Sequence, residues 1–447
     1  MNQSKKKGGN DSLQAPKGMR DILGADFYTY QGFFEKASEI AMYYGFTPIE
    51  TPVMEYESLF RRGTGEDTDI VSKEMYSVRT KSDDRLALRP EGTPSAMRAY
   101  FENGMQSQPQ PVLLYYHGPF FRHDRPQKGR YRQFYQFGLE AIGTGKSIID
   151  ATIIRVTMLI LEEAGLKNLR LEINSIGDKE CRPNYRRELV NYYRKNAKNI
   201  CADCRERLKT NPLRLLDCKN PACQETKQGA PSSISFLCPA CKTHFREILE
   251  YLEMMGISYE INNNLVRGLD YYSRTVFEIS KTNIDRATEL AELGANPEAV
   301  EVPALSVAGG GRYDYLARSL GNKKDVPAVG AAIGVDRVIM SEQHLKLHPR
   351  ILKKPKIFFI QLSFEAKLKS LAIIEILRKA KVPIAQSISK DSLGTQLAIA
   401  EKLEVPYVII LGQKEAVDGT VIVRNMQNRS QDIIKIEKLA DFLKELK

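Results

Sequence analysis

The chain has 447 residues, of which 42% are hydrophobic, and carries a formal net charge of +11 at pH 7. Its length exceeds that of an ordinary single domain and predicts two to four domains with sizeable cores. A positive balance of this size favours an acidic partner, most commonly nucleic acid, and a highly charged protein without such a partner is the alternative. No apolar run reaches about 18 residues, so we expect no membrane span.

The N-terminus and the cysteines indicate the compartment. Residues 1–15 are mostly polar and lack the apolar centre of a signal peptide, so we expect a disordered tail there. The seven cysteines are an odd number. Without a secretion signal they favour a reducing cytoplasm over disulfides.

The next segment, residues 16–21, is predicted to form a turn before a helix at about 27–44, whose apolar residues follow helical spacing. Residues 46–54 then continue as an extended segment. Its two prolines restrict it to a sheet edge or an interface. A strand at 86–88 leads into residues 89–93, where Glu91 and Thr93 suggest a polar binding corner. A capped turn before a helix near 94–102 fits the same residues.

A basic stretch, Phe121–Gln136, is the central feature of the chain. Apolar runs at 112–116 and 134–139 flank it, which predicts two strands joined by a basic loop. Arginine binds phosphate and carboxylate oxygens in pairs, so this loop suits a polyanion, whereas a solvated charged hairpin is the plain alternative. The stretch contains Arg122, Arg125, Lys128, Arg130 and Arg132.

Polar side chains also recur along the strand that follows. Alternation places Gln136, Gly138 and Glu140 on one face, where the carboxylate needs a cationic or N–H partner. After a helix at 149–164 and a strand at 169–173, a largely helical insertion covers about 178–256 and contains all seven cysteines.

Two of the cysteine pairs have Cys-x2-Cys spacing. Together they predict one tetrahedral structural zinc site, although the gap between the pairs is longer than in usual zinc fingers. Reduced, buried cysteines are the alternative. The predicted ligands are Cys201, Cys204, Cys238 and Cys241.

Three further segments complete the first part. Arg267 precedes Gly268, and Tyr271 and Tyr272 follow, which suits close approach to a ligand, although core tyrosines beside a surface arginine are equally compatible. Residues 281–299 are polar and carry no chemical signature. A glycine run at 309–311 permits close backbone approach.

A strand at 327–334 then leads into a helix that begins near Arg337. The organisation is that of an α+β domain around an antiparallel sheet. A basic linker at 346–355 separates it from a compact α/β domain at 356–447 with alternating strands and helices.

Together these blocks resemble the histidyl-tRNA synthetases, a family of class II aminoacyl-tRNA synthetases, from residue 16 onward. The segment ending Thr51-Pro52-Val53 resembles motif 1 (the dimer interface in that family), Phe121–Gln136 resembles motif 2, and Val329–Arg337 resembles motif 3. Residues 89–93 and 265–272 are similar to the two stretches that distinguish the histidine enzyme. The C-terminal domain resembles the shared anticodon-binding domain, so the resemblance implies a class II catalytic domain at 16–345.

The resemblance implies a cytoplasmic, homodimeric histidine–tRNA ligase that uses ATP and Mg²⁺ to activate L-histidine and then charges tRNA(His). Arg122 and Arg267 are then the catalytic residues at the α-phosphate. Asp124 stands where the family usually has glutamate. The implied ATP-binding residues are Arg122, Asp124 and Arg337; the histidine-binding residues are Glu91, Thr93, Gln136, Glu140, Arg267, Tyr271 and Tyr272; and the tRNA-binding residues are Arg125, Gln127 and Arg132.

Three alternatives differ from this reading. A histidine-sensing regulatory paralogue without ligase activity should lack the C-terminal domain and Arg267, and both are present. A class II synthetase for threonine or proline does not explain Glu140 with Tyr271 and Tyr272. A pure RNA-binding module explains the charge but not the polar pocket.

Overall fold

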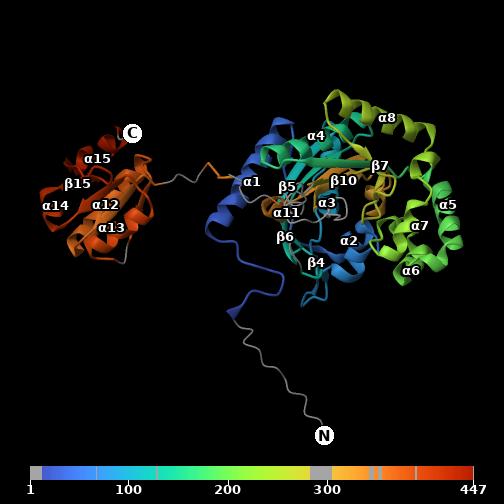
Figure 1. Ribbon diagram of the computed structural model, residues 1–447, viewed down its shortest axis with the longest axis horizontal. Coiled ribbons are helices and arrows are strands. Elements are labelled where there is room, and N and C mark those ends of the chain that lie inside the picture. The colour runs from blue at the N-terminus through green and yellow to red at the C-terminus, as the bar shows by residue number, and fades with distance from the viewer. Residues whose placement is uncertain are drawn as a thin grey trace, which may run out of the picture. The chain divides into compact units, whose positions relative to one another are not determined.

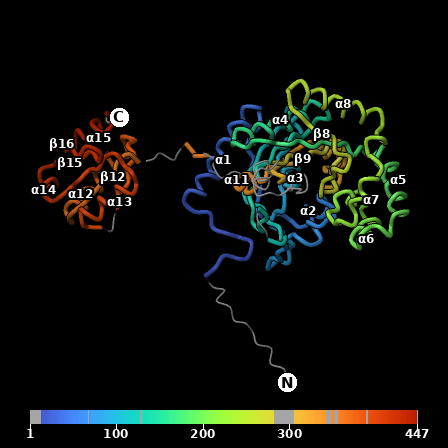
Figure 2. Tube along the Cα trace, viewed as in Figure 1, coloured from blue at the N-terminus to red at the C-terminus, as the bar shows by residue number. Residues whose placement is uncertain are grey.

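The computed structural model describes residues 13–66, 68–126, 129–281, 305–341, 347–350, 355–387 and 390–445. Gln127, most of the 281–299 segment and the first twelve residues of the predicted tail lie outside these ranges. The chain forms two compact units, residues 1–349 and 350–447. Figure 2 traces the path of each unit. Within the described ranges, no helix has the length and apolar character needed to cross a membrane.

The first unit is built on an eight-stranded sheet in the order β1-β5-β6-β11-β10-β9-β7-β8. β1 is parallel to β5 and β7 is parallel to β8, while the other neighbours are antiparallel. The expected antiparallel sheet is therefore confirmed. The strands are β1 (Thr47–Pro48), β5 (Val112–Phe121), β6 (Gln133–Ile142), β7 (Leu169–Ser175), β8 (Glu260–Ile261), β9 (Ser273–Lys281), β10 (Leu305–Arg312) and β11 (Ala328–Gly334).

One face of this sheet is covered by helices α1 (Gly24–Tyr43), α4 (Ser147–Glu163) and α8 (Pro239–Met254) (Figure 1). Side chains alternate along a strand, so Phe137 and Leu139 of β6 enter the core beneath these helices. The residues between them, Gln136, Gly138 and Glu140, belong to the opposite face. The sequence alternation that predicted one polar face of β6 is thus reproduced in the sheet.

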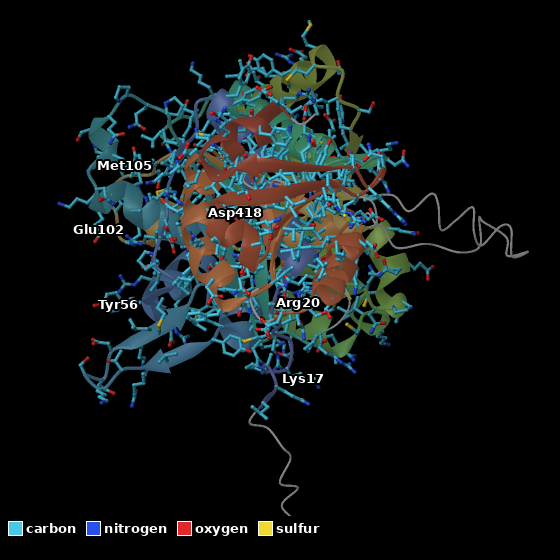
Figure 3. The ribbon with its side chains drawn as sticks, turned by 90° about the vertical axis from the view of Figure 1, so that its left-hand side faces the viewer. Lys17, Arg20, Tyr56, Glu102, Met105 and Asp418 are labelled. Carbon is cyan, nitrogen blue, oxygen red and sulfur yellow. The ribbon has the colours of Figure 1, made fainter. Side chains whose placement is uncertain are left out.

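The opposite face carries a smaller sheet, β2-β4-β3, and the part of the insertion that precedes α8. Figure 3 shows Tyr56 of the small sheet, and Glu102 and Met105 near the end of α3, along one edge of the unit. The elements are β2 (Met54–Tyr56), α2 (Glu57–Thr64), β3 (Ser77–Arg79), β4 (Arg85–Leu88), α3 (Thr93–Glu102), α5 (Arg182–Lys195), α6 (Ala202–Thr210), α7 (Gln224–Gln228) and α10 (Leu316–Ser319). Helix α11 (Val335–Ser341) follows β11 and packs in the core with α1 and α4.

Two expectations about backbone are refined. The proline-containing segment 46–54 supplies β1, which lies at the edge of the large sheet as predicted, because Pro48 cannot donate a ladder hydrogen bond. The glycine run at 309–311, expected to permit close backbone approach, lies within strand β10 between β9 and β11. A Cβ added at Gly310 would lie 2.1 Å from the Gly330 carbonyl oxygen, so the run allows close strand approach.

A buried ion network links the sheet to α4. The Arg312 side chain is fully buried and pairs with Asp150 of α4 and, at 3.0 Å, with Asp314. Its Nη1 also donates to the Thr144 carbonyl at 3.0 Å. Buried charges are tolerated only when paired and hydrogen-bonded, and here both conditions are met. The network therefore fixes the end of β10 against the start of α4.

The second unit has a five-stranded sheet in the order β13-β12-β14-β15-β16. The first three strands are parallel and the last two pairings are antiparallel, with apolar clusters on both faces. The alternating strands and helices expected for this domain are present among its described residues, and the short helix α14 adds to them. The elements are β12 (Ile357–Gln361), α12 (Phe364–Lys379), β13 (Ile384–Gln386), α13 (Leu393–Lys402), β14 (Tyr407–Leu411), α14 (Gln413–Asp418), β15 (Thr420–Asn425), β16 (Gln431–Lys435) and α15 (Ile436–Glu445).

Candidate active site

A cleft of about 570 Å³ opens on the face of the large sheet away from α1 and α4. Seven segments far apart in the sequence form it: residues 69–74, the turn before α3, the end of β5 with the basic loop, β6, residues 207–219 of the insertion, the 267–272 loop, and β10–β11 with the start of α11. This convergence unites most of the residues singled out from sequence. Those lining the cleft are Glu91, Thr93, Arg122, Asp124, Gln136, Arg267, Tyr271, Tyr272 and Arg337.

Glu140 lies directly beneath the floor of the cleft and is 1% exposed. Its carboxylate accepts hydrogen bonds from Thr93 Oγ1 at 2.8 Å, from Tyr116 OH at 3.0 Å and from Tyr313 OH. Burial raises the pKa of Glu140 to about 7, and these three donors oppose the shift. The group is thus an acceptor whose charge is only partly stabilised by the protein itself.

The ring of Tyr116 reaches Glu140 across a glycine. Tyr116 of β5 lies opposite Gly138 of β6, and a Cβ on Gly138 would lie 2.1 Å from the Tyr116 ring. Any larger residue at this position would displace the tyrosine. Glycine at 138 therefore serves close packing above the carboxylate.

Glu91 forms a second buried acceptor. Thr64 Oγ1 donates to one of its oxygens and Tyr271 OH donates to the other, each at 2.6 Å. Burial raises the pKa of Glu91, and the two hydroxyl donors and the Arg122 charge act against this rise. Residues 89–93 were predicted to form either a polar binding corner or a turn before a helix. Both features are present, because α3 begins at Thr93 and Glu91 lines the cleft.

Gln136 and the paired tyrosines complete the polar floor. Gln136 Oε1 is buried and has no hydrogen-bond partner among the described residues. A buried amide oxygen without a donor costs free energy, so its position suits a ligand N–H. Tyr271 and Tyr272 have ring centroids 4.7 Å apart, and burial raises the pKa of Tyr272 to about 12, which keeps its hydroxyl protonated.

Arg267 lies at the side of the cleft and is held by Glu278 of β9, with Nη1 2.6 Å from Oε2. Burial opposes its charge, but the Glu278 carboxylate, together with Tyr272, Tyr271 and Asp217, raises the Arg267 pKa overall. The guanidinium rests on β10 at Gly309, where an added Cβ would lie 2.6 Å from Nη1. Arg267 therefore lines the cleft and is not a surface arginine beside core tyrosines.

Arg122 and Arg337 approach the cleft from two other elements. Arg122 donates through Nε to the Pro90 carbonyl at 2.9 Å, and Arg337 donates through Nη1 to the Ser306 carbonyl at 2.8 Å. The pKa of Arg337 is lowered by burial and by the like charges of Arg130 and Arg122. Mutually repelling cations held by backbone carbonyls indicate a site for an anion with several charges.

The basic loop is partly used by the protein itself. Asp124 pairs with Arg130 at 3.2 Å and accepts from the Arg125 amide at 2.6 Å. Arg132 donates to the backbone carbonyls of Asp124 and Lys17, at 3.3 and 3.4 Å, so its guanidinium contacts the chain's own N-terminal segment. Arg125 is exposed and does not line the cleft. Gln127 lies outside the described residues.

Sequence reasoning missed two residues that contact Glu140. Tyr116 and Tyr313 both donate to its carboxylate, and both line the cleft. The signal for Tyr116 was its place on a strand predicted to pair with the one that contains Glu140. Tyr313 directly follows the glycine run and Arg312, and only the sheet register brings it to Glu140.

The four predicted zinc ligands do not converge on one point. Cys201 and Cys204 cluster with Cys218 and Cys223, whereas Cys238 and Cys241 cluster with Asp178 and Cys181. The single site predicted from the two Cys-x2-Cys pairs is therefore wrong. The partners of Cys201 and Cys204 lie in the segment that follows that pair. The partners of Cys238 and Cys241 lie just after the end of β7.

Known proteins agree with this geometry. The family model described as histidyl-tRNA synthetase matches residues 18–338, and one described as an anticodon binding domain matches residues 356–446. The chain belongs to the histidyl-tRNA synthetase family. This membership makes it a class II aminoacyl-tRNA ligase, as the resemblance implied, and the regulatory alternative is not favoured.

Relatives cover nearly the whole chain. A histidine–tRNA ligase of Desulforamulus reducens is 40% identical over 429 residues, which are 96% of this chain and 98% of that protein. One of Dehalococcoides mccartyi strain BAV1 is 43% identical over 426 residues, or 95% and 98%. The crystal structure of apo histidyl-tRNA synthetase of S. aureus has a TM-score of 0.77 at 29% identity, covering 97% of this chain and all of that one.

Proposed function

We propose that the cleft of this family member binds ATP and L-histidine, joins them as histidyl-adenylate with release of pyrophosphate, and then transfers histidine to the 3′ end of tRNA(His). The observation that carries the proposal is the juxtaposition of three arginines, Arg122, Arg267 and Arg337, with a polar floor of Glu91 and Gln136 above the buried Glu140. The arginines suit a triphosphate, and the floor suits the ammonium and N–H groups of a small amino acid.

The arginines act on the charge that develops during activation. A histidine carboxylate oxygen attacks the α-phosphorus, the bond to the bridging oxygen of pyrophosphate breaks, and negative charge grows on the transferring group. Arg122 and Arg267 would hold the α-phosphate, and Arg337 would hold the γ-phosphate end. Because protein groups fix each guanidinium in advance, reorganisation during the step is small.

ATP brings Mg²⁺, which would neutralise phosphate charge that the arginines leave uncompensated. The carboxylates of Glu74 and Asp124 line the same cleft and are suitable oxygen donors to that ion or to its waters. In the proposal Asp124 also keeps Arg130 oriented toward the nucleotide. In the family the usual glutamate at this position contacts adenine, and the shorter Asp124 side chain keeps the charge but reaches less far.

Glu140 would select histidine. Its carboxylate is held by Thr93, Tyr116 and Tyr313 and offers an acceptor to one imidazole nitrogen. The Tyr272 hydroxyl offers a donor to the other. A site built to hydrogen-bond a ligand N–H rejects isosteres that lack it, because its own buried groups are then unpaired. Tyr271 would line the same slot.

The α-amino group would bind to Glu91, Thr93 and Gln136. The unpartnered Gln136 oxygen and the Glu91 carboxylate, held by Thr64 and Tyr271, are both acceptors. An ammonium group donates three hydrogen bonds and accepts none. Acceptors from the turn before α3 and from β6 thus suit one cationic group.

For tRNA(His), we propose that Arg125 and Gln127 of the basic loop contact the acceptor stem and that the second unit binds the anticodon. Arg125 is exposed, whereas Arg132 is held by Lys17, so we expect Arg132 to position the loop more than to bind phosphate. The positive net charge of the chain favours this partner.

We further propose a cytoplasmic homodimer. The cysteines are all described and are free thiols, which suits a reducing compartment. Val53, Met54 and Tyr56, which follow the motif 1 proline, are 39%, 38% and 63% exposed, and Figure 3 shows Tyr56 at an outer edge of the first unit. Exposed apolar side chains on one small sheet suit burial against a second copy.

The test is aminoacylation of a tRNA(His) transcript with labelled histidine, ATP and Mg²⁺. We expect charging by the full chain and loss of charging in Arg267→Ala. Glu163→Gln, an exposed change outside the cleft, is the matched control and should charge normally. Histidine binding without charging by the unaltered chain would contradict the proposal.

A further inference from the structure

The insertion contains two compact ligand clusters that the ligase reaction does not use. The first consists of Cys201, Cys204, Cys218 and Cys223, whose sulfurs all lie within 4.8 Å of one another. Cys201 Sγ is 3.9 Å from Cys218 Sγ, and Cys223 Sγ is 4.0 Å from Cys204 Sγ. We call this cluster site A. We propose that it and the second cluster each bind one structural Zn²⁺.

The sulfur distances in site A fit a tetrahedral ion. Zinc–thiolate bonds of about 2.3 Å place the sulfurs at the corners of a tetrahedron with edges of about 3.8 Å. The two distances in site A agree with that edge and are far longer than a disulfide of about 2.05 Å. Four thiols at this separation therefore leave a central space of the size that a zinc ion fills.

The second cluster, site B, consists of Asp178, Cys181, Cys238 and Cys241, whose ligand atoms also lie within 4.8 Å of one another. Asp178 and Cys181 have the same spacing as Cys238 and Cys241. Site B is thus a pair of x2 motifs in which a carboxylate takes one thiolate position. Zinc accepts carboxylate oxygen beside sulfur ligands.

Backbone amides support the sulfurs of both sites. The Cys201 amide donates to Cys223 Sγ at 3.2 Å, and the Asn220 amide donates to Cys218 Sγ at 3.5 Å. In site B the Cys238 amide donates to Cys181 Sγ at 3.0 Å. Donors of this kind stabilise metal-bound thiolates.

Both Cys-x2-Cys pairs also sit where a helix begins. Cys201 is the residue before α6, and Cys238 is the residue before α8. The partial positive charge of a helix N-terminus favours the thiolate form that zinc requires. In site B, Arg274 adds a full charge, 3.3 Å from Asp178.

Site A stabilises a segment that lines one side of the active-site cleft. The short helix Pro212–Asp217 lies between Cys204 and Cys218, and its Arg214 donates to the Gly268 carbonyl at 2.7 Å and pairs with Asp69 at 2.8 Å. Both Arg214 and Asp69 line the cleft. An ion at site A thus holds the segment that supports the loop containing Arg267. Figure 1 shows α5, α6 and α7 grouped on one side of the first unit.

Site B serves a different junction. It ties the end of β7, through Asp178 and Cys181, to the start of α8, through Cys238 and Cys241. Because Asp178 also pairs with Arg274 at the start of β9, loss of this ion would loosen the base of the insertion where it leaves the sheet.

The experiment measures bound metal in the full chain purified without chelator, by inductively coupled plasma mass spectrometry. We expect two zinc ions per chain, one in Cys204→Ser, one in Cys241→Ser and none in the double variant. Retention of the second ion in each single variant also shows that the rest of the insertion folds. Amide hydrogen exchange should rise at 212–217 in Cys204→Ser and stay unchanged there in Cys241→Ser.

Cobalt substitution distinguishes the ligand sets. We expect Asp178→Cys to keep two cobalt ions and to increase the thiolate-to-cobalt charge-transfer absorbance, because site B then has four sulfurs. A chain without zinc whose seven thiols all react with Ellman's reagent in the native state would overturn the proposal. So would a single ion that is lost in both single variants, or a disulfide within either cluster.

Discussion

Replacing Glu140 by glutamine should separate selection of histidine from stability of the fold. The variant keeps the shape of the side chain beside Thr93, Tyr116 and Tyr313 but removes the charge. A hydrogen bond to a charged acceptor contributes about 1.5–3 kcal/mol. We therefore expect kcat/KM for histidine in pyrophosphate exchange to fall roughly 10- to 150-fold, with a smaller change in KM for ATP.

The stability of the free enzyme should change in the opposite direction. Burial raises the pKa of Glu140 from 4.5 to about 7. A raised pKa in the folded state means that the protonated carboxyl favours folding below about pH 4.5 and that this contribution is lost as the pH rises to about 7. The difference of about 2.5 pKa units corresponds to about 3 kcal/mol. Glu140→Gln should escape this loss and unfold with a free energy higher by up to about 3 kcal/mol at pH 8.

Urea unfolding at pH 5 and pH 8, followed by far-ultraviolet circular dichroism because the chain has no tryptophan, measures this difference. Glu163→Gln is the control, since Glu163 is half-exposed and pairs with Lys36 at 3.2 Å. It should leave both stability and exchange nearly unchanged. An apo Glu140→Gln enzyme that is less stable than the unaltered chain at pH 8, or one with unchanged histidine kinetics, would refute the reasoning.

Three further changes test other contacts. Arg312→Met leaves Asp150 buried without its cation and should lower the unfolding free energy by about 3–5 kcal/mol in urea; a loss below about 1 kcal/mol would contradict the buried network. Gly138→Ala places a methyl group against the Tyr116 ring and should weaken histidine binding, which calorimetry measures. An unchanged affinity would contradict the role of this packing. Arg337→Ala should raise KM for ATP roughly tenfold or more and leave KM for histidine within about twofold, and equal effects on both would reject its assignment to the triphosphate.

Contiguous motifs explain why so much of the site was visible in the sequence. Glu91 with Thr93, and Tyr271 with Tyr272, each lie within a few residues of one another, and alternation alone separated Glu140 from the core side of β6. The strand and helix order of the second unit followed in the same way from short apolar runs. These predictions depend on local periodicity, which the folded chain keeps.

The remaining features depend on long-range register. Tyr313 meets Glu140 only because β10 lies next to β11 and β11 next to β6. The prediction of a single zinc site was wrong for a related reason, because spacing identifies a Cys-x2-Cys pair but not the residues that complete its site. Asp178 is not a cysteine, so the cysteine spacing did not identify it as a ligand. The contact of Arg132 with the Lys17 carbonyl is likewise a long-range feature that local sequence does not reveal.

The most direct measurement of the central claim is pyrophosphate exchange without tRNA, with each of the twenty amino acids in turn. It tests the cleft alone, without the tRNA contacts proposed for Arg125 and the second unit. We predict exchange with histidine only, abolished in Arg267→Ala and partly restored in Arg267→Lys. Exchange with another amino acid in place of histidine, or full exchange in Arg267→Ala, would contradict the claim.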